Sequence, residues 1–173
     1  MKKLIFLIST IIIFSGCQNK NDETVDFSKN FLIGKIDGNN FQITVDKNIL
    51  LEQVNSSLYP TKRVLNNVEI LSSFTSGDIK EKFYFISFTS KETKVTVVRY
   101  LFRKDNNLFI ENSMNKENFQ FQDFFIGCEG NGSCFPKLFK INKDYIWACT
   151  DNPNCVSPEE AKKSDCHYTA SVL

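Results

Sequence analysis

The 173-residue chain has a single histidine, His167, and almost no net charge, with 21 Lys and Arg against 20 Asp and Glu. One histidine excludes metal and catalytic sites that need several imidazoles. The balanced charge excludes the strongly basic face that binds nucleic acid. The sequence also has no C-x-x-C pair, no G-x-S-x-G or H-E-x-x-H segment and no glycine motif for phosphate. We therefore expect no cofactor, no metal and no nucleic-acid partner.

The first sixteen residues have the form of a secretory signal. A basic start at Lys2 and Lys3 precedes an apolar run from Leu4 to Phe14, and small residues follow. The run is shorter than the roughly 20 apolar residues of a membrane-spanning helix. Residues 1–16 are therefore expected to be removed from the mature protein.

The residues around the expected cleavage point, Phe14-Ser15-Gly16-Cys17, resemble the lipobox of bacterial lipoproteins. That family usually has Leu three residues before the cysteine, where this chain has Phe14. The resemblance implies that Cys17 is acylated and becomes the first mature residue. Each buried CH₂ of an acyl chain contributes about 0.8 kcal/mol, so several chains together anchor a protein in a membrane.

Residues 17–30 begin with a polar stretch that has no apolar periodicity, and they are expected to form a flexible tether. The charged part of this stretch resembles the surface-export signal of Bacteroidetes lipoproteins. A simple solvated spacer is an equal alternative. The expected location is the bacterial cell envelope, at the outer membrane, with the leaflet left open.

The sequence predicts that residues 31–126 form one α+β body. Turn residues separate runs with the two-residue period of strands, and Asp46 is a suitable N-cap for a helix ending near Pro60. We expect an antiparallel β-meander of six or seven strands with one helix on one face. The predicted strands are Phe31–Ile36, Phe41–Val45, Val68–Phe74, Phe83–Phe88, Thr93–Arg103, Leu108–Glu111 and Phe119–Asp123, and the predicted helix runs from Asp46 to about Leu58.

Residues 127–173 form a cysteine-rich tail, which is expected to be loop-rich, stapled by disulfides and packed on the body. Export places thiols where disulfides persist. A local scheme pairs Cys128 with Cys134 and Cys149 with Cys155 and leaves Cys166 over. A crossed scheme joins two loop segments, the one around Cys128 and Cys134 and the one around Cys149 and Cys155, to each other. The candidates are Cys128, Cys134, Cys149, Cys155 and Cys166.

Other interpretations of this region are weaker. The five-residue spacing within each cysteine pair is wide for structural zinc. Cys166 and His167 are neighbours that could form an activated thiolate only if their side chains met. Trp147 is expected to cover a disulfide. A platform of Phe119, Phe121, Phe124 and Phe125 competes with core packing, which is favoured because strands must bury one face.

The outline of a lipidated cysteine, a small β-rich body and a cysteine-rich tail resembles small Cys-rich lipoproteins of Bacteroidetes. The sequence therefore predicts a membrane-anchored lipoprotein that acts as a non-enzymatic binding or structural module, with an unknown protein or glycan ligand. The alternative is a thiol-redox or metal-binding envelope protein that uses the C-terminal cysteines.

Overall fold

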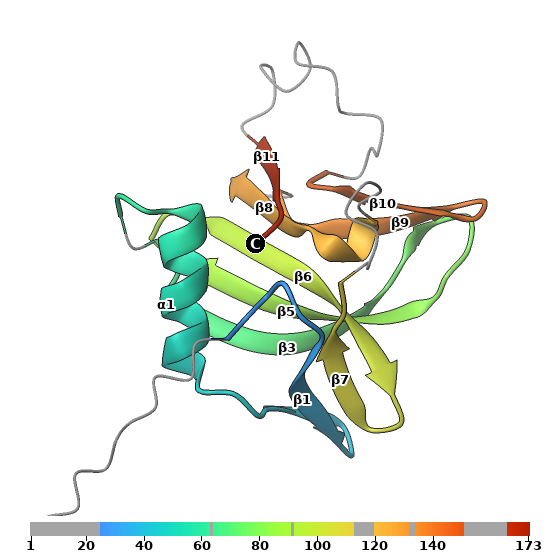
Figure 1. The fold of residues 1–173 in the computed structure, drawn as a ribbon. Coiled ribbons are helices and arrows are strands. Elements are labelled where there is room, and N and C mark those ends of the chain that lie inside the picture. Colours follow the sequence, from blue (N-terminus) through green and yellow to red (C-terminus); the bar gives the residue numbers. More distant parts are fainter. Residues whose placement is uncertain (1–24, 63, 91, 113–119, 132–133, 151–165) are drawn as a thin grey trace, which may run out of the picture.

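The structure is a computed structural model that describes residues 25–62, 64–90, 92–112, 120–131, 134–150 and 166–173. Within these residues it consists of an eight-stranded sheet, a three-stranded sheet and one α-helix (Figure 1). The large sheet contains β1 Phe31–Asp37, β2 Asn40–Ile43, β3 Asn67–Phe74, β5 Lys82–Ser90, β6 Val95–Lys104, β7 Asn107–Ile110, β8 Phe125–Gly130 and β11 Cys166–Ser171. The small sheet contains β4 Ser76–Gly77, β9 Lys137–Ile141 and β10 Asp144–Ala148, and the helices are α1 Lys47–Leu58 and the short 3₁₀ helix η1 Phe121–Asp123.

Strand β6 is the branch point of the large sheet. Its first part pairs antiparallel with both β5 and β8, and its last three residues pair with β7. From β7 the sheet continues through β1 to β2, and beyond β8 it ends at β11. The expected antiparallel sheet with one helix is confirmed, but strand dominates more than in a balanced α+β fold, and the branching at β6 replaces a simple meander.

The first β-hairpin and α1 form where the sequence predicted them. β1 and β2 pair across a turn at Gly38, whose φ of 59° suits glycine. Asp46 caps α1 by accepting hydrogen bonds from the backbone N–H of Asn48 at 2.7 Å and of Ile49 at 3.4 Å. The turn residue and the capping side chain therefore determine where the β1–β2 hairpin turns and where α1 begins.

The main core lies between α1 and one face of the large sheet. The helix contributes Leu50, Leu51 and Val54, which are buried against strand residues such as Ile86 and Phe88. The sheet curls strongly enough to bring β3 against β1. A Cβ added at Gly34 would lie 2.3 Å from Cδ1 of Ile70 and 2.7 Å from the backbone oxygen of Gln42. Because the backbone of β2 cannot move aside easily, a residue without a side chain is favoured at this approach.

Residues 25–30 pack on the body, although the sequence placed them in the tether. The side chains of Val25 and Phe27 are buried in the main core. The backbone N–H of Val25 donates to Oε1 of Gln53 on α1 at 2.9 Å, and Nδ2 of Asn112 donates to the Phe27 carbonyl at 2.7 Å. The packed part of the chain therefore begins by residue 25 rather than at Phe31.

A second core lies on the opposite face of the large sheet, beneath the β9–β10 hairpin. Phe83 and Phe85 of β5 meet Leu138 and Trp147 there. β5 is therefore buried on both faces, as its continuous apolar run predicted. Nε1 of Trp147 donates to the Phe121 carbonyl at 3.1 Å, which satisfies the polar atom of this buried indole.

Two expectations for the end of the chain are wrong. In the range Phe119–Asp123, where a strand was predicted, Phe119 lies outside the described residues and Phe121–Asp123 form η1. The Asp123 carboxylate accepts a hydrogen bond from the Gln120 backbone N–H at 2.7 Å and closes this turn. The tail is also not mainly loops where it is described, since β8 is part of the large sheet and β9, β10 and β11 follow it.

The described helices include none with the length and apolar character of a membrane span.

Candidate functional site

Two disulfides hold the C-terminal strands together. Cys128 of β8 bonds to Cys149 after β10, with Cα atoms 5.5 Å apart, and Cys134 bonds to Cys166 of β11, with Cα atoms 5.4 Å apart. The prediction of disulfides among the tail cysteines is confirmed for these four residues. Cys155 lies outside the described residues.

The local pairing scheme is wrong, and so is the choice of Cys166 as the odd cysteine. Cys128 lies in β8, and the β9–β10 hairpin folds back over the same face of the sheet and brings Cys149 to it. The Cys128 side chain enters the second core, where Cys149 also lies. The first bridge therefore joins the two loop segments, as the crossed scheme proposed, and the second ties β11 to the turn after β8.

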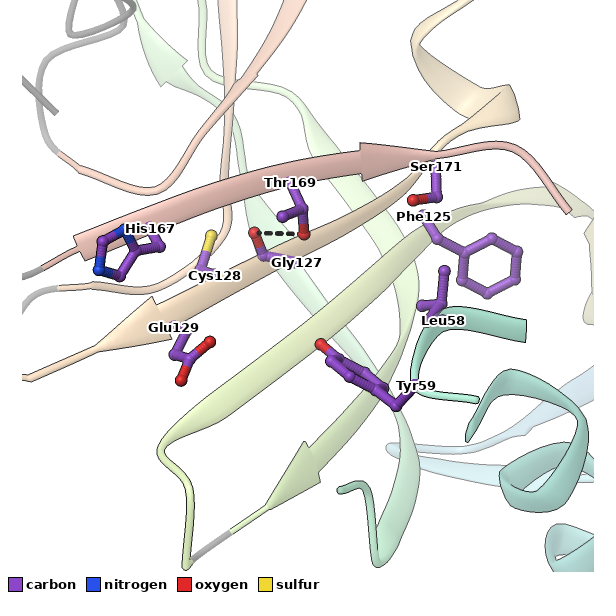
Figure 2. Close-up of a pocket in the computed structure, with 9 residues that line it drawn as sticks. All are labelled: Leu58, Tyr59, Phe125, Gly127, Cys128, Glu129, His167, Thr169 and Ser171. Atoms are coloured by element: carbon purple, nitrogen blue, oxygen red, sulfur yellow. Dashed lines mark hydrogen bonds between the residues drawn. The ribbon is translucent and has the colours of Figure 1, made fainter. Parts of the chain in front are cut away.

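A pocket of about 140 Å³ opens where the end of α1 faces β8 and β11 (Figure 2). We call it the β8–β11 pocket. Its floor is apolar, with Phe125 and Gly127 of β8 and Leu58 of α1. Five polar side chains line it: Tyr59, Glu129, His167, Thr169 and Ser171.

The register of β8 against β11 brings these groups to one face. His167 lies opposite Glu129, Thr169 opposite Gly127, and Ser171 opposite Phe125. Alternate residues of a strand point to the same face of the sheet, so the imidazole and the carboxylate are cross-strand neighbours. Figure 2 shows both strands side by side, with the Tyr59 hydroxyl turned toward β8.

Gly127 allows β11 to lie close over the pocket floor. A Cβ at this position would lie 2.4 Å from Oγ1 of Thr169. The Thr169 hydroxyl instead donates to the Gly127 carbonyl at 3.4 Å, as the dashed line in Figure 2 shows. A side chain at position 127 would therefore displace Thr169.

The end of α1 fixes Tyr59 at the pocket. The Tyr59 backbone N–H donates to the Asn55 carbonyl at 2.7 Å as the C-cap of the helix, and Pro60 follows. Burial raises the pKa of the Tyr59 phenol, and the negative charge of Glu129 raises it further. The phenol therefore stays protonated in the neutral range and is available as a hydrogen-bond donor.

The sequence suggested Cys166 and His167 as a pair that could form an activated thiolate, but in the structure their side chains do not meet. The Cys166 sulfur is bonded to Cys134, and successive residues of β11 point to opposite faces. His167 instead lies on the pocket face of β11, opposite Glu129 in the pairing with β8. Sequence reasoning missed this site because the alternation in β11 gives no indication that β8 is its partner.

The aromatic platform considered from the sequence is divided between the two cores. Phe125 belongs to the main core, whereas Phe121 lies at the second core, stacked on Tyr145 with ring centres 4.6 Å apart. Phe124 is half-buried, and Phe119 lies outside the described residues. Core packing, the favoured interpretation, accounts for Phe125.

The described residues contain no group of three or more His, Cys, Asp or Glu side chains placed to hold a metal ion. No protein-family model, curated protein or solved structure matches the chain. Its function therefore has to be inferred from its own residues.

Proposed function

We propose that the protein is an exported lipoprotein of the bacterial envelope, anchored by acyl chains on Cys17, whose body is a non-enzymatic binding module. The observation that carries the proposal is Ser15-Gly16-Cys17 directly after a short apolar run. The two disulfides support export, because such bonds persist in oxidising compartments. The packed body begins by Val25, which leaves a short segment after Cys17 as the link to the membrane.

The β8–β11 pocket is the proposed binding site, and the terminal sugar of a glycan, only part of which enters this small pocket, is the proposed ligand. Glu129 offers acceptors, Tyr59 offers a donor and part of an aromatic face, and His167 offers both a donor and an acceptor when neutral. Sugar hydroxyls pair with such groups, while the C–H faces of a sugar ring pack on an aromatic ring. The hydroxyl of Thr169 already donates to the Gly127 carbonyl, which favours binding over nucleophilic chemistry.

Fractionation of the native bacterium tests the anchor. The full chain should sediment with the envelope membranes and enter detergent, whereas Cys17→Ala should lose its acyl chains and its membrane association. Cys155→Ala is the matched control, because it removes a cysteine without touching the lipobox. Equal membrane association of all three proteins would refute acylation as the anchor.

The single histidine makes the pocket test direct. His167 gives the only imidazole signals in the proton NMR spectrum of the full chain, so titration with N-acetylglucosamine or its disaccharide should shift signals from the pocket itself. Glu129→Gln should weaken binding several-fold, because charge-assisted hydrogen bonds are the strong ones. Glu111→Gln removes the same charge from an exposed residue elsewhere and should leave the titration unchanged.

A further inference from the structure

The β1–β2 and β6–β7 hairpins meet at one end of the large sheet, in the lower part of Figure 1. Residues of both hairpins line a second pocket. Its volume is about 330 Å³. The backbone N–H of Ile36 donates to the Asn106 carbonyl at 2.7 Å and joins the two hairpins. We call this cavity the basic pocket, and its polar side chains are Asn39, Ser72, Lys82, Tyr84, Arg103 and Asn106.

Two cations share one aromatic ring in the basic pocket. Nζ of Lys82 lies 5.6 Å from the centre of the Tyr84 ring, and Cζ of Arg103 lies 5.7 Å from the same centre. Tyr84 is 7% exposed and packs edge-on against Phe41. The core therefore fixes the position of the Tyr84 ring, and both cations make cation–π contacts with it.

The guanidinium of Arg103 is held in place before any ligand arrives. Nη1 donates to the Tyr84 hydroxyl oxygen at 2.9 Å, and Nε donates to the Asp105 carbonyl at 2.6 Å. These two bonds leave N–H groups of Arg103 for a further acceptor. Since the Tyr84 oxygen accepts from Arg103, its own O–H remains a donor.

The basic pocket has no negative charge of its own. None of its lining residues is Asp or Glu. The ion pairs found in the described part of the chain join Lys29 to Asp26 and Lys140 to Glu81, and so involve neither Lys82 nor Arg103. Two positive charges around one ring repel each other, and an anion between them would remove that repulsion.

We propose that the basic pocket binds the carboxylate or phosphate group of a small organic anion about as large as an acidic monosaccharide. Arg103 recognises the planar or tetrahedral oxyanion, Lys82 adds a second charge, and the Tyr84 hydroxyl donates a hydrogen bond. The amide and hydroxyl groups of Asn39, Asn106 and Ser72 suit the hydroxyls of such a ligand. The volume is in the range of small-molecule sites, which begins at about 300 Å³.

This site is independent of the proposed glycan site. The basic pocket and the β8–β11 pocket share no lining residue. Loss of binding at one can therefore be measured while the other is intact.

Calorimetric titration of the full chain in nonionic detergent tests the proposal. The probes are glucuronate for the carboxylate, glucose 6-phosphate for the phosphate, and glucose as the neutral control. Arg103→Gln should weaken binding of the anion by about tenfold or more, which corresponds to about 1.4 kcal/mol. Lys82→Gln, at an exposed position, should weaken it several-fold without affecting folding.

Lys104→Gln is the matched control. It removes the same charge one residue along β6, where the side chain points to the opposite face, and it should leave the affinity unchanged. Binding of either anion, but not of glucose, with loss in Arg103→Gln and Lys82→Gln supports the site, and the preferred probe identifies the oxyanion. Absence of binding of both anions at about 10 mM, equal binding of glucose, or an equal loss in Lys104→Gln overturns it.

Discussion

The guanidinium of Arg99 lies over the ring of Phe125 inside the main core, with Cζ 4.9 Å from the ring centre. Arg99 is fully buried, and burial lowers its pKa to about 10 against the opposing effect of the Asp123 carboxylate. Nη2 donates to Oδ1 of Asn112, whereas Nε and Nη1 have no hydrogen-bond partner within the described residues. The free energy of burying this cation depends on the charges and hydrogen-bond acceptors around it.

Asp123→Asn is therefore expected to destabilise the fold. The amide oxygen still accepts from the Gln120 backbone, so the substitution removes mainly the charge that balances Arg99. Removing the nearby negative charge that partly offsets the burial of Arg99 should lower the free energy of unfolding, measurable by urea unfolding.

The double variant with Arg99→Met provides the control. It removes the buried cation together with the carboxylate, and it should be more stable than Asp123→Asn alone. A double variant with the summed loss of both single variants would show that the two charges are not coupled.

Phe27→Ala should destabilise the body by about 3 kcal/mol, the usual cost of truncating a buried phenylalanine. Phe27 is 4% exposed, and its ring lies edge-on to Phe125, with ring centres 5.2 Å apart. The measurement is the free energy of unfolding of the full chain. Lys29→Ala, at an exposed residue of the same segment, should change it little; similar effects of both substitutions would place residues 25–30 outside the folded body.

The two disulfides should respond differently to mild reduction. Cys128 and Cys149 are buried in the second core, whereas Cys166 is only half-buried. Alkylation after graded reductant should therefore label Cys134 and Cys166 first. Loops closed by residues 21 and 32 apart predict about 3 to 4 kcal/mol from each bridge in the chain-entropy model.

Paired alanine variants separate loop closure from packing. Cys128→Ala with Cys149→Ala should cost more than Cys134→Ala with Cys166→Ala, because Cys128 and Cys149 are more deeply buried in the second core than Cys134 and Cys166. In the reduction experiment, labelling of Cys128 and Cys149 before Cys134 and Cys166 would contradict the expected order of reduction. Because the bridges take up four of the five tail cysteines, we expect Cys155, in place of Cys166, to be the cysteine left over.

The features that the sequence predicted correctly are local. The cap at Asp46, the turn at Gly38 and the apolar run of β5 each carry their own signal within a few residues. The branching at β6 and the pairing of β8 with β11 depend on contacts between distant segments, which no short pattern encodes. At Asp123 the period-two pattern was present, but the side chain hydrogen bond and the buried charge of Arg99 favoured a turn.

The same distinction applies to the candidate sites. Cysteines are visible in any sequence, so the bridges were expected, but their pairing follows from β8 and β11 lying together. The basic pocket combines β3, β5 and two hairpin turns, and nothing in the separate segments marks Lys82 and Arg103 as neighbours of one ring.

The acid stability of the fold should depend in part on Glu81. Hydrogen bonds from Lys140 and Tyr145 lower the pKa of this carboxyl below its usual value. Because the folded-state pKa is the lower one, the stabilising contribution is present above the unfolded-state pKa and is lost as the pH falls through the folded-state value.

Glu81→Gln should therefore lower the melting temperature near neutral pH and flatten its decline below about pH 4.5, the ordinary pKa of a glutamate. Glu111→Gln is the control, at an exposed carboxylate elsewhere, and should keep the acid dependence of the wild-type chain. Parallel acid profiles for Glu81→Gln and the wild type would show that the contacts with Lys140 and Tyr145 do not stabilise the fold in solution.

The intact mass of the protein taken from its native membrane shows whether it is an exported lipoprotein anchored through Cys17. We expect a chain that begins at Cys17, lacks residues 1–16 and carries the additional mass of acyl chains on that first residue. An unmodified chain that still begins at Met1, or one cut elsewhere with an unmodified Cys17, would contradict it.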